Sequence, residues 1–304
     1  MTRVHPFAGN TFDRLAERRK DTEWLRQQLT RDDLRILPVW RGKVLIESME
    51  KMPRLAEITR ASFISAELNH DELILLGEFH DQLFFALSLP NEVEPALTSA
   101  AQFHDLRAVS GLLQRDELSL LGYARALVHW RSTHQFCGKC GSRNLPQHAG
   151  HVMACSNTDC GQHSFPRLDP AVIVLITDGE RVLLGRQSRF PPGRYSTIAG
   201  FVEWAESIEE AVIREAHEET GVTVDQVQYH SSQPWPFPSS LMLGFIAHAT
   251  TTDITLNDGE LEDARWFSLH DIASGAVSLP PPQSISFALI EHWYDSKSSR
   301  RLRD

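Results

Sequence analysis

The stretch that decides the fold is residues 200–222, GFVEWAESIEEAVIREAHEETGV. It contains seven glutamates and no aspartate, a density that is usually found on a solvated, salt-bridged surface helix. Ser207, followed three residues later by Glu210, has the capping-box pattern that starts a helix. Thr220 and Gly221 supply the pattern that ends one. The sequence therefore predicts a helix between Ser207 and Gly221.

The helical period places glutamates on the face that should be buried. At about 100° per residue, four apolar residues share that face: Ile208, Ala211, Val212 and Ala216. Glu215 and Glu219 point into the middle of the same face, one turn apart, and Glu218 lies at its edge. Ionised carboxylates on a buried face are costly unless a cation compensates them, and such ligands suit Mg²⁺ or Mn²⁺. We therefore predict a divalent-metal site here. The polar residues that point elsewhere are Glu209, Glu210, Arg214 and His217.

The same stretch resembles a complete Nudix box, the loop–helix–loop signature of hydrolases that cut nucleoside diphosphates linked to another group. The matching positions are Gly200, Glu206, Arg214, Glu215, Ala216, Glu218, Glu219, Gly221 and Val222. The resemblance implies an α+β fold, the Nudix α/β/α sandwich with a mixed sheet. Because Arg214 lies away from the metal face, we expect it to orient the glutamates through ion pairs.

Composition and charge limit what the whole chain can do. Its 304 residues, 41% of them hydrophobic, are enough for two domains and a small third. The formal net charge of −10 argues against binding of nucleic acid through general electrostatics. The chain shows no signal-peptide core and no run of about 20 apolar residues, so we expect a cytoplasmic protein that does not enter a membrane. The basic tail at 300–304 is expected to be a frayed terminus.

Three regions follow one another along the chain. We predict a small N-terminal α/β scaffold domain at 1–132, a zinc ribbon at 133–166 and a Nudix domain at 167–304. In the first region, apolar segments at 34–46, 62–68 and 72–89 predict a meandering sheet. Helical periodicity over 106–130 predicts two helices split near Arg115. In the last region we expect strands at 171–176, 181–184, 224–229, 241–249 and 264–267, a segment at 195–199 that leads into the box, and a helix at 284–294.

All cysteines of the chain lie in the middle region: Cys137, Cys140, Cys155 and Cys160. Two disulfides would need an oxidising compartment, and the chain shows no export signal. Two paired cysteine knuckles in a cytosolic chain indicate instead a tetrahedral site in which all four thiolates bind one zinc ion. Since no coordination position remains open, the zinc should be structural. Zinc ribbons also often bind nucleic acid, which is the competing interpretation.

Residues 232–240, SQPWPFPSS, form what we call the aromatic loop. Three prolines stiffen its backbone, while Trp235 and Phe237 offer flat apolar surfaces. One interpretation is a hydrophobic surface plug, and the other is a wall that binds a base or a ribose near the metal helix. The loop resembles the array that marks NADH pyrophosphatases among Nudix proteins. A zinc ribbon directly before the catalytic domain is also typical of that group.

This second resemblance implies an activity and a set of site residues. Members of the group cut the pyrophosphate of NADH or NAD⁺, releasing AMP and nicotinamide mononucleotide, and also remove NAD caps from RNA. The residues implied to bind more than one Mg²⁺ or Mn²⁺ are Ala199, through its carbonyl, with Glu215, Glu218, Glu219 and Glu260. Glu219 is also the candidate base. The residues implied to bind substrate are Gln233, Pro234, Trp235, Pro236, Phe237, Pro238, Ser239, Ser240 and Ser286.

Two aromatic residues complete the implied site. Phe201 and Phe165 match positions that sandwich adenine across the interface of a homodimer. Phe165 stands where a tyrosine also occurs in the family, so stacking is kept while a hydroxyl contact is lost. Glu262 and Asp263 lie so close to Glu260 that either could take its place as the downstream ligand. Two other functions stay open: a Nudix hydrolase of another nucleoside diphosphate derivative, and a non-catalytic protein that senses NAD.

Overall fold

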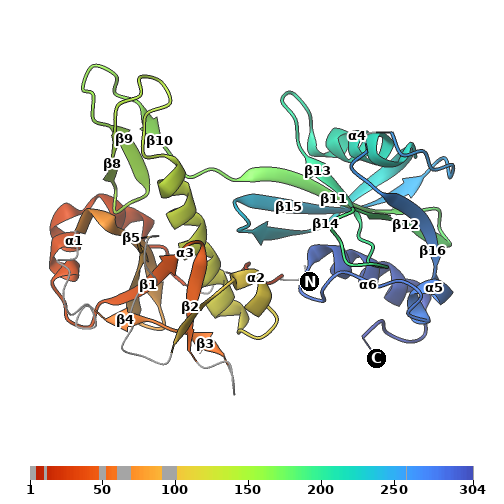
Figure 1. The fold of residues 1–304 in the computed structure, drawn as a ribbon, viewed down its shortest axis with the longest axis horizontal. Coiled ribbons are helices and arrows are strands. Elements are labelled where there is room, and N and C mark those ends of the chain that lie inside the picture. The colour runs from red at the N-terminus through yellow and green to blue at the C-terminus, as the bar shows by residue number, and fades with distance from the viewer. Residues whose placement is uncertain are drawn as a thin grey trace. The chain divides into compact units, whose positions relative to one another are not determined.

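The structure, a computed structural model, describes residues 5–9, 12–47, 53–59, 70–90, 101–257 and 259–303 (Figure 1). The chain divides into two compact units. The C-terminal unit holds Asp169–Pro234 and Ser240–Asp304, together with His5. The N-terminal unit holds Pro6–Leu168 and also the short segment Trp235–Ser239, which is the tip of the aromatic loop. The loop tip therefore belongs to a different unit from the strands on either side of it.

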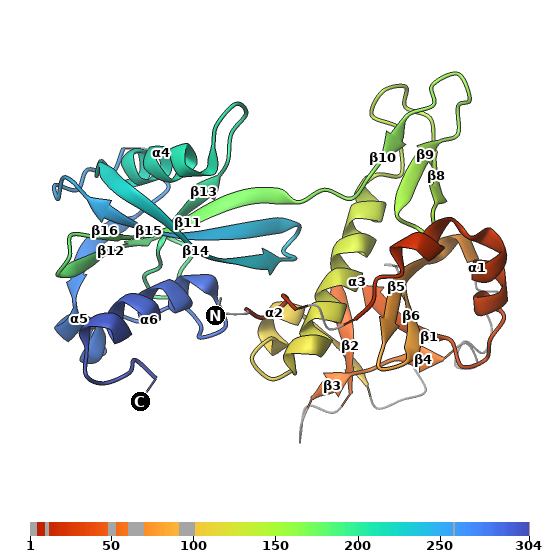
Figure 2. The same cartoon turned by 180° about the vertical axis from the view of Figure 1, so that it is seen from behind.

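The N-terminal unit is built around a seven-stranded sheet (Figure 2). Its strands are β1 Arg35–Trp40, β2 Lys43–Glu47, β3 Arg54–Leu55, β4 Ile58–Thr59, β5 Leu73–Phe79, β6 Gln82–Ser88 and β7 Gln102–His104. The strand order is β3-β2-β1-β6-β5, with β4 paired with β1 and β7 paired with β2. The predicted sheet is confirmed at 34–46 and 72–89, and the predicted strand at 62–68 lies outside the described residues.

The N-terminal unit also contains helices. They are η1 Ala16–Lys20, α1 Thr22–Leu29, η3 His70–Glu72, α2 Leu106–Val109 and α3 Arg115–Thr133. The predicted split of the 106–130 segment is confirmed, because α2 ends at Val109 and α3 begins at Arg115. α3 packs against β1, β2, β5 and β6. Its buried face, which includes Leu120, Leu121 and Leu127, joins the apolar core of the unit.

The zinc ribbon is a three-stranded antiparallel sheet within the N-terminal unit. Its strands are β8 Asn144–Gln147, β9 Val152–Cys155 and β10 His163–Ser164, in the order β10-β9-β8. The ribbon is bonded to the edge of the larger sheet. The Leu75 amide donates to the Ala149 carbonyl at 3.0 Å, and Nε2 of the buried His151 lies 2.7 Å from the Leu75 carbonyl oxygen. Burial lowers the pKa of His151 to about 4, so this ring is neutral at physiological pH.

A mixed sheet organises the C-terminal unit. Its strands are β11 Asp169–Thr177, β12 Arg181–Arg186, β13 Ile198–Phe201, β14 Val224–Trp235, β15 Ser240–Ala249 and β16 Asp263–Ser268. The order is β14-β15-β11-β12-β16, and β13 pairs with β11. β11 runs parallel to β15 along its whole length and antiparallel to β12 and β13. The expected strands are thus confirmed, and their ends agree closely except that β14, expected to end at Tyr229, continues to Trp235.

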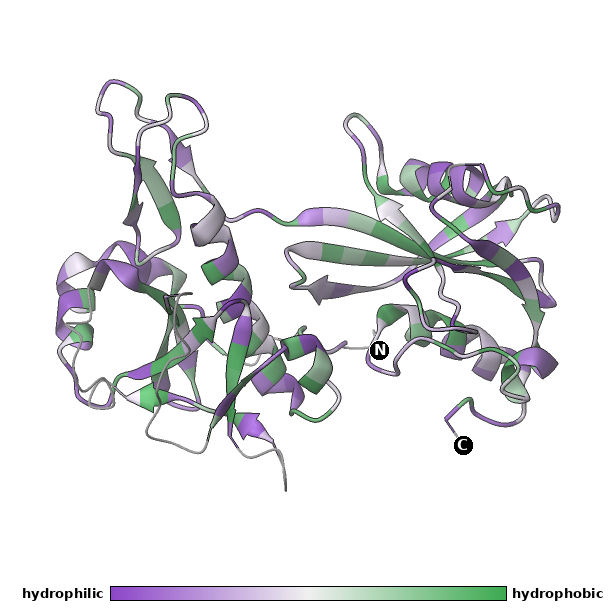
Figure 3. Ribbon diagram, viewed as in Figure 1, coloured by the Kyte–Doolittle hydropathy of each residue, from purple (hydrophilic) through white to green (hydrophobic). Residues whose placement is uncertain are grey.

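Helices lie on both faces of this sheet: α4 Ile208–Thr220 on one, and α5 Leu269–Ala273 with α6 Ile285–Lys297 on the other (Figure 1). Alternate residues of β11 contribute to the cores on the two faces of the sheet, because successive side chains along a strand point to opposite sides. Val172 and Val174 join the core beneath α4, while Ile173 and Leu175 join the core beneath α6. Residues 285–290 of α6 are mostly hydrophobic (Figure 3). The predicted α/β/α sandwich is therefore confirmed.

Two local predictions are wrong. The aromatic loop is shorter than residues 232–240, because β14 continues to Trp235 and β15 begins at Ser240. β14 is an edge strand of its sheet, where a proline such as Pro234 is tolerated. The C-terminal tail is not frayed at Arg303, whose guanidinium pairs with Glu291 and lies 5.3 Å from the Phe287 ring centroid. No helix in the described part of the chain is long and apolar enough to cross a membrane.

Candidate active site and zinc ribbon

The caps of α4 are those that the sequence predicts. The Ser207 hydroxyl accepts from the Glu210 amide, and the Glu210 carboxylate accepts from the Ser207 amide at 2.8 Å, which completes the capping box. Gly221 ends the helix with φ +70°, in the left-handed region that favours glycine. A Cβ at Gly221 would also approach the Thr255 side chain to 3.1 Å. Both ends of the helix are therefore fixed by local contacts.

The buried face of α4 carries carboxylates as well as apolar side chains. Ala211, Val212 and Ala216 are fully buried, and Glu219 is only 2% exposed. Glu215 is half-buried, and Glu218 is exposed at the edge. Burial raises the pKa of Glu215, and the nearby negative charges of Glu218 and Glu260 raise it further, although Arg214 acts in the opposite direction. The predicted placement of Glu215, Glu218 and Glu219 on the helix is confirmed.

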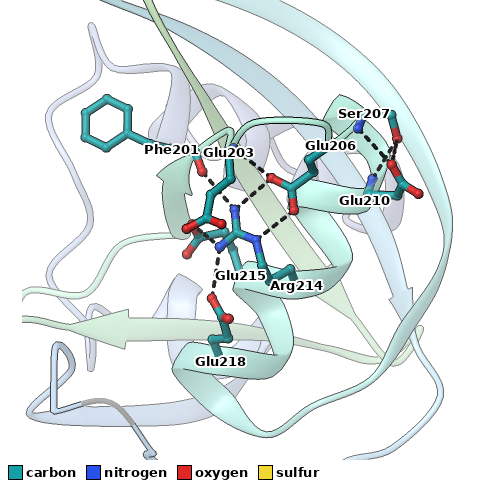
Figure 4. A network of polar contacts seen from close by, with 8 residues as sticks. All are labelled: Phe201, Glu203, Glu206, Ser207, Glu210, Arg214, Glu215 and Glu218. Atoms are coloured by element: carbon teal, nitrogen blue, oxygen red, sulfur yellow. Dashed lines mark hydrogen bonds and ion pairs between the residues drawn. The ribbon is translucent and has the colours of Figure 1, made fainter.

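Arg214 is the centre of an ion-pair network that spans the loop and the helix (Figure 4). Its Nε and Nη2 bind both carboxylate oxygens of Glu206, at 2.7 and 2.9 Å. Its Nη1 donates to Glu215 at 2.8 Å and to Glu218 at 2.9 Å. Its Nη2 also donates to the Phe201 carbonyl at 2.8 Å. The predicted ion pairs are confirmed, but the side chain does not point away from the glutamates, because it is long enough to reach across the turn.

This network shifts the pKa values of its members as well as holding their side chains in place. Hydrogen bonds from Arg214 lower the pKa of Glu206, and the same bonds raise the pKa of Arg214. A planar guanidinium that binds one carboxylate through two parallel bonds has little freedom to rotate. Arg214 therefore holds the β13–α4 loop against the helix and sets the direction of Glu215. Sequence reasoning found this residue but not its bond to the Phe201 carbonyl, which no motif encodes.

Gly200 leaves room for the carboxylate of Glu215. A Cβ placed on Gly200 would lie 1.9 Å from Cδ and Oε1 of Glu215, closer than any two such atoms can approach. Gly200 and Ala199 lie on β13, against which α4 packs. The glycine therefore lets a half-buried carboxylate sit directly on the strand backbone, next to the peptide that contains the Ala199 carbonyl.

We expect Gly200→Ala to lower turnover by about 10²-fold, because a misplacement of about 1 Å at a catalytic group has that effect. Glu215 must move away from its position to relieve the clash. In a Glu215→Ala background the clash is absent, so the same glycine substitution should not lower the melting temperature further. Equal losses of stability in the two backgrounds would show that Gly200 matters for another reason.

The donor set fits a hard divalent cation. Glu219 supplies a buried carboxylate and Glu215 a half-buried one, and the charges of Glu218 and Glu260 act on Glu215 from nearby. Of the other downstream acids, Glu262 pairs with Arg186 at 3.1 Å and Asp263 pairs with Arg265 at 2.7 Å. A cation would relieve the repulsion among these carboxylates. Within the described ranges, the cysteines are the only group of three or more His, Cys, Asp or Glu side chains whose ligand atoms all lie within 4.8 Å of one another, so the glutamates are less tightly gathered.

The four cysteines fit one zinc ion. Their Sγ atoms all lie within 4.8 Å of one another. The Cys137–Cys160 and Cys140–Cys155 pairs are 3.8 and 3.4 Å apart. Zn–S bonds of about 2.3 Å in a tetrahedron place sulfur atoms about 3.8 Å apart, whereas a disulfide needs about 2.05 Å. The predicted zinc ligands are therefore confirmed as a cluster, whose spacing suits one shared zinc ion better than two disulfides.

Turns around the knuckles aim the thiols inward. Gly141 has φ +76°, and its amide donates to the Cys137 carbonyl at 2.8 Å. Hydrogen bonds from Ser142 lower the pKa of Cys140 to about 6, which favours the thiolate that binds metal. Burial raises the pKa of Cys155 to about 12, so this thiol would become a ligand only with the charge of a metal beside it.

Two implied substrate residues are buried in internal hydrogen bonds. Gln233 is 1% exposed; its Nε2 donates to the Gln283 carbonyl at 2.9 Å, and its Oε1 accepts from the Ile285 amide at 2.8 Å. Ser286 is 4% exposed and accepts from the Thr197 amide at 3.1 Å. These bonds tie β14 and the segment before β13 to the first turn of α6. Ser240 is likewise buried, at the start of β15.

Pro236 is also buried, and the other implied substrate residues are more open. Pro238 is exposed, and Pro234, Trp235, Phe237 and Ser239 are half-buried. Phe201 and Phe165 are 58% and 51% exposed, and they belong to different units. The Phe201 ring points away from the Arg214 network (Figure 4). Exposed rings of this kind are available for stacking.

Three family models match consecutive parts of the chain. They describe an "NADH pyrophosphatase-like rudimentary NUDIX domain" at residues 34–130, an "NADH pyrophosphatase zinc ribbon domain" at 132–165 and a "NUDIX domain" at 167–286. The first match describes a rudimentary Nudix domain in the region where the sequence analysis predicts a small α/β scaffold domain.

Curated proteins are similar over most of the chain. "Nudix hydrolase 19, chloroplastic" of Arabidopsis thaliana is 40% identical, over 79% of this chain and 61% of the relative. "NAD-capped RNA hydrolase NUDT12" of Homo sapiens is 43% identical, over 60% of this chain and 42% of the relative. "NAD-capped RNA hydrolase NudC" of Stutzerimonas stutzeri is 44% identical, over 71% of this chain and 75% of the relative. The chain thus spans less than two thirds of the first two relatives and three quarters of the third.

Proposed function

We propose that the protein hydrolyses the pyrophosphate of NADH or NAD⁺, because the chain belongs to the Nudix hydrolase family and carries the NADH pyrophosphatase zinc ribbon. The products would be AMP and nicotinamide mononucleotide. The observation that carries this proposal is the pair of carboxylates on the inward face of α4, the buried Glu219 and the half-buried Glu215 that lies against Gly200. Relatives named as NAD-capped RNA hydrolases support the further proposal that the protein removes NAD caps from RNA.

The residues that would hold more than one Mg²⁺ or Mn²⁺ are the Ala199 carbonyl, Glu215, Glu218, Glu219 and Glu260. Bound there, such ions neutralise phosphate charge and lower the pKa of water. Glu219 takes the proton from the attacking water as general base. The water oxygen bonds to phosphorus in line with the leaving phosphate, and the bond to the bridging oxygen breaks. Arg214 keeps Glu215 and Glu218 in position throughout through its ion pairs.

The partners of the protein follow from the same proposal. Gln233–Ser240 and Ser286 would bind the dinucleotide, and the exposed rings of Phe165 and Phe201 would sandwich adenine across a homodimer interface. A cytoplasmic location would suit a zinc site of four thiolates, because thiols are kept reduced there.

One experiment tests the proposal directly. The purified protein is incubated with NADH and either Mg²⁺ or Mn²⁺, and the products are separated by chromatography. We expect equal amounts of AMP and nicotinamide mononucleotide. ADP-ribose and a nucleoside triphosphate are offered in parallel, and faster cleavage of either would favour another Nudix specificity. Binding of NADH without any cleavage would favour the NAD-sensing alternative. A transcript that starts with NAD tests cap removal in the same way.

A further inference from the structure

The tip of the aromatic loop is seated on the N-terminal unit, and we infer that Arg125 of α3 is a positioning residue that sets how this loop recognises substrate. The inference rests on the proposed function, which gives the loop its substrate. It assigns to the N-terminal unit a part in substrate selectivity, where the sequence predicts only a scaffold. Two features carry it: three prolines leave the loop short of backbone donors, and Arg125 supplies one from outside the loop.

The loop cannot supply hydrogen-bond donors for all of its own backbone carbonyls. Pro234, Pro236 and Pro238 have no amide hydrogen, so three of its peptide units offer acceptors without donors. Within the tip, the Phe237 amide donates to the Trp235 carbonyl at 2.7 Å. Pro236 is buried, and a buried carbonyl without a donor costs free energy. Its carbonyl must therefore find a donor elsewhere in the molecule.

Arg125 supplies that donor from a position 111 residues away in sequence. Its Nη1 donates to the Pro236 carbonyl, while its Nε donates to the Gly42 carbonyl at 2.9 Å. Its guanidinium also lies 4.8 Å from the centre of the Phe237 ring. One rigid fork thus joins the loop to the turn between β1 and β2. A rigid fork fixes its partners more firmly than a flexible ammonium group does.

Contacts to the aromatic rings also hold the loop tip against the rest of the N-terminal unit. The Phe7 ring meets Trp235 and Phe237 edge-on, at centroid distances of 6.2 and 5.6 Å. Arg107 lies 4.6 Å from the Phe237 ring and 5.5 Å from the Trp235 ring. Gly122 of α3 leaves space for the loop, because a Cβ there would lie 3.3 Å from Cγ of Pro236. The two rings are therefore held in one arrangement by residues of the N-terminal unit.

Arg125→Met tests this inference. We expect the KM for NADH to rise about tenfold, because a loop that is no longer held must be ordered when the substrate binds. The value of kcat should change little, because the loop would contact substrate and transition state alike. Arg125→Lys, which keeps the charge but not the fork, should restore part of the affinity. Amide hydrogen exchange of Trp235, Phe237 and Ser239 should become faster in Arg125→Met, while exchange in α4 stays unchanged.

Arg131→Met is the matched control. Arg131 lies on the same helix and is also half-buried, and it donates to the Asp71 and Leu73 carbonyls instead of to the loop. Its loss should lower the melting temperature and leave the KM unchanged. The inference is overturned if Arg131→Met raises the KM as much as Arg125→Met, or if loop exchange is the same in Arg125→Met and wild type. If the wild-type protein does not cleave NADH, the proposed function fails, and hydrogen exchange alone still decides whether Arg125 holds the loop.

Discussion

Glu219→Gln should lower turnover on NADH by at least the roughly 10²–10⁴-fold that a general base contributes. The amide keeps the size of the side chain but cannot take a proton from water and is a poor ligand for a hard cation. Glu219 is 2% exposed on the face of α4 that also buries Ala216. The fold should survive, because replacing a buried charge with a neutral group of the same shape leaves no cavity and can even stabilise the metal-free protein. Steady-state kinetics and a thermal melt measure the two effects separately.

Glu209→Gln is the control for this prediction. It changes the same chemical group on the same helix, but Glu209 is exposed on the outward face. Its kinetics and its affinity for Mn²⁺ should match those of the wild type. Similar losses of activity in both variants would mean that the two faces of α4 have been assigned wrongly. A Glu219→Gln protein that stays fully active would contradict the role of this residue as base or ligand.

The parts of the fold that sequence could predict are those encoded by neighbouring residues. Ser207, Glu210 and Gly221 fix the ends of α4 through contacts within a few positions, so the helix and its buried face follow from spacing alone. The unbroken apolar run in β11 predicts a strand buried on both sides, and both cores are present. The cysteine spacing predicts the zinc cluster for the same reason, since each knuckle is a local turn.

Contacts between distant segments are not predictable in this way. Nothing near Arg125 or Arg107 indicates that they meet an aromatic loop more than 100 residues later. Three prolines make residues 232–240 look like a loop, although an edge strand accepts Pro234. Arg303 looks like part of a frayed tail because its partner, Glu291, belongs to a helix whose polar side cannot be read from the tail itself. Each of these depends on the tertiary fold, which single-residue preferences do not determine.

The burial of Gln233 and Ser286 bears on how the implied substrate residues should be understood. Gln233 is hydrogen-bonded to the segment that starts α6, and Ser286 of α6 is hydrogen-bonded to the segment before β13. A role in which they hold β14 and α6 together is compatible with the proposed substrate contacts made by their neighbours. The aromatic tip, by contrast, is held by the N-terminal unit. The residues of the aromatic loop are therefore held partly by contacts within the C-terminal unit and partly by contacts within the N-terminal unit.

Cys140→Ser should remove the zinc and unfold the ribbon, because the binding energy of a structural zinc, about 10–16 kcal/mol in isolated fingers, is folding energy. The ribbon is bonded to β5 through Ala149 and His151, so the N-terminal unit should lose stability with it. Metal analysis by mass spectrometry and hydrogen exchange measure the two effects. Exchange should rise in residues 137–160 and in β5, while α4 in the C-terminal unit stays protected. Wild-type protein that contains no zinc yet keeps 137–160 protected would contradict the structural role of the metal.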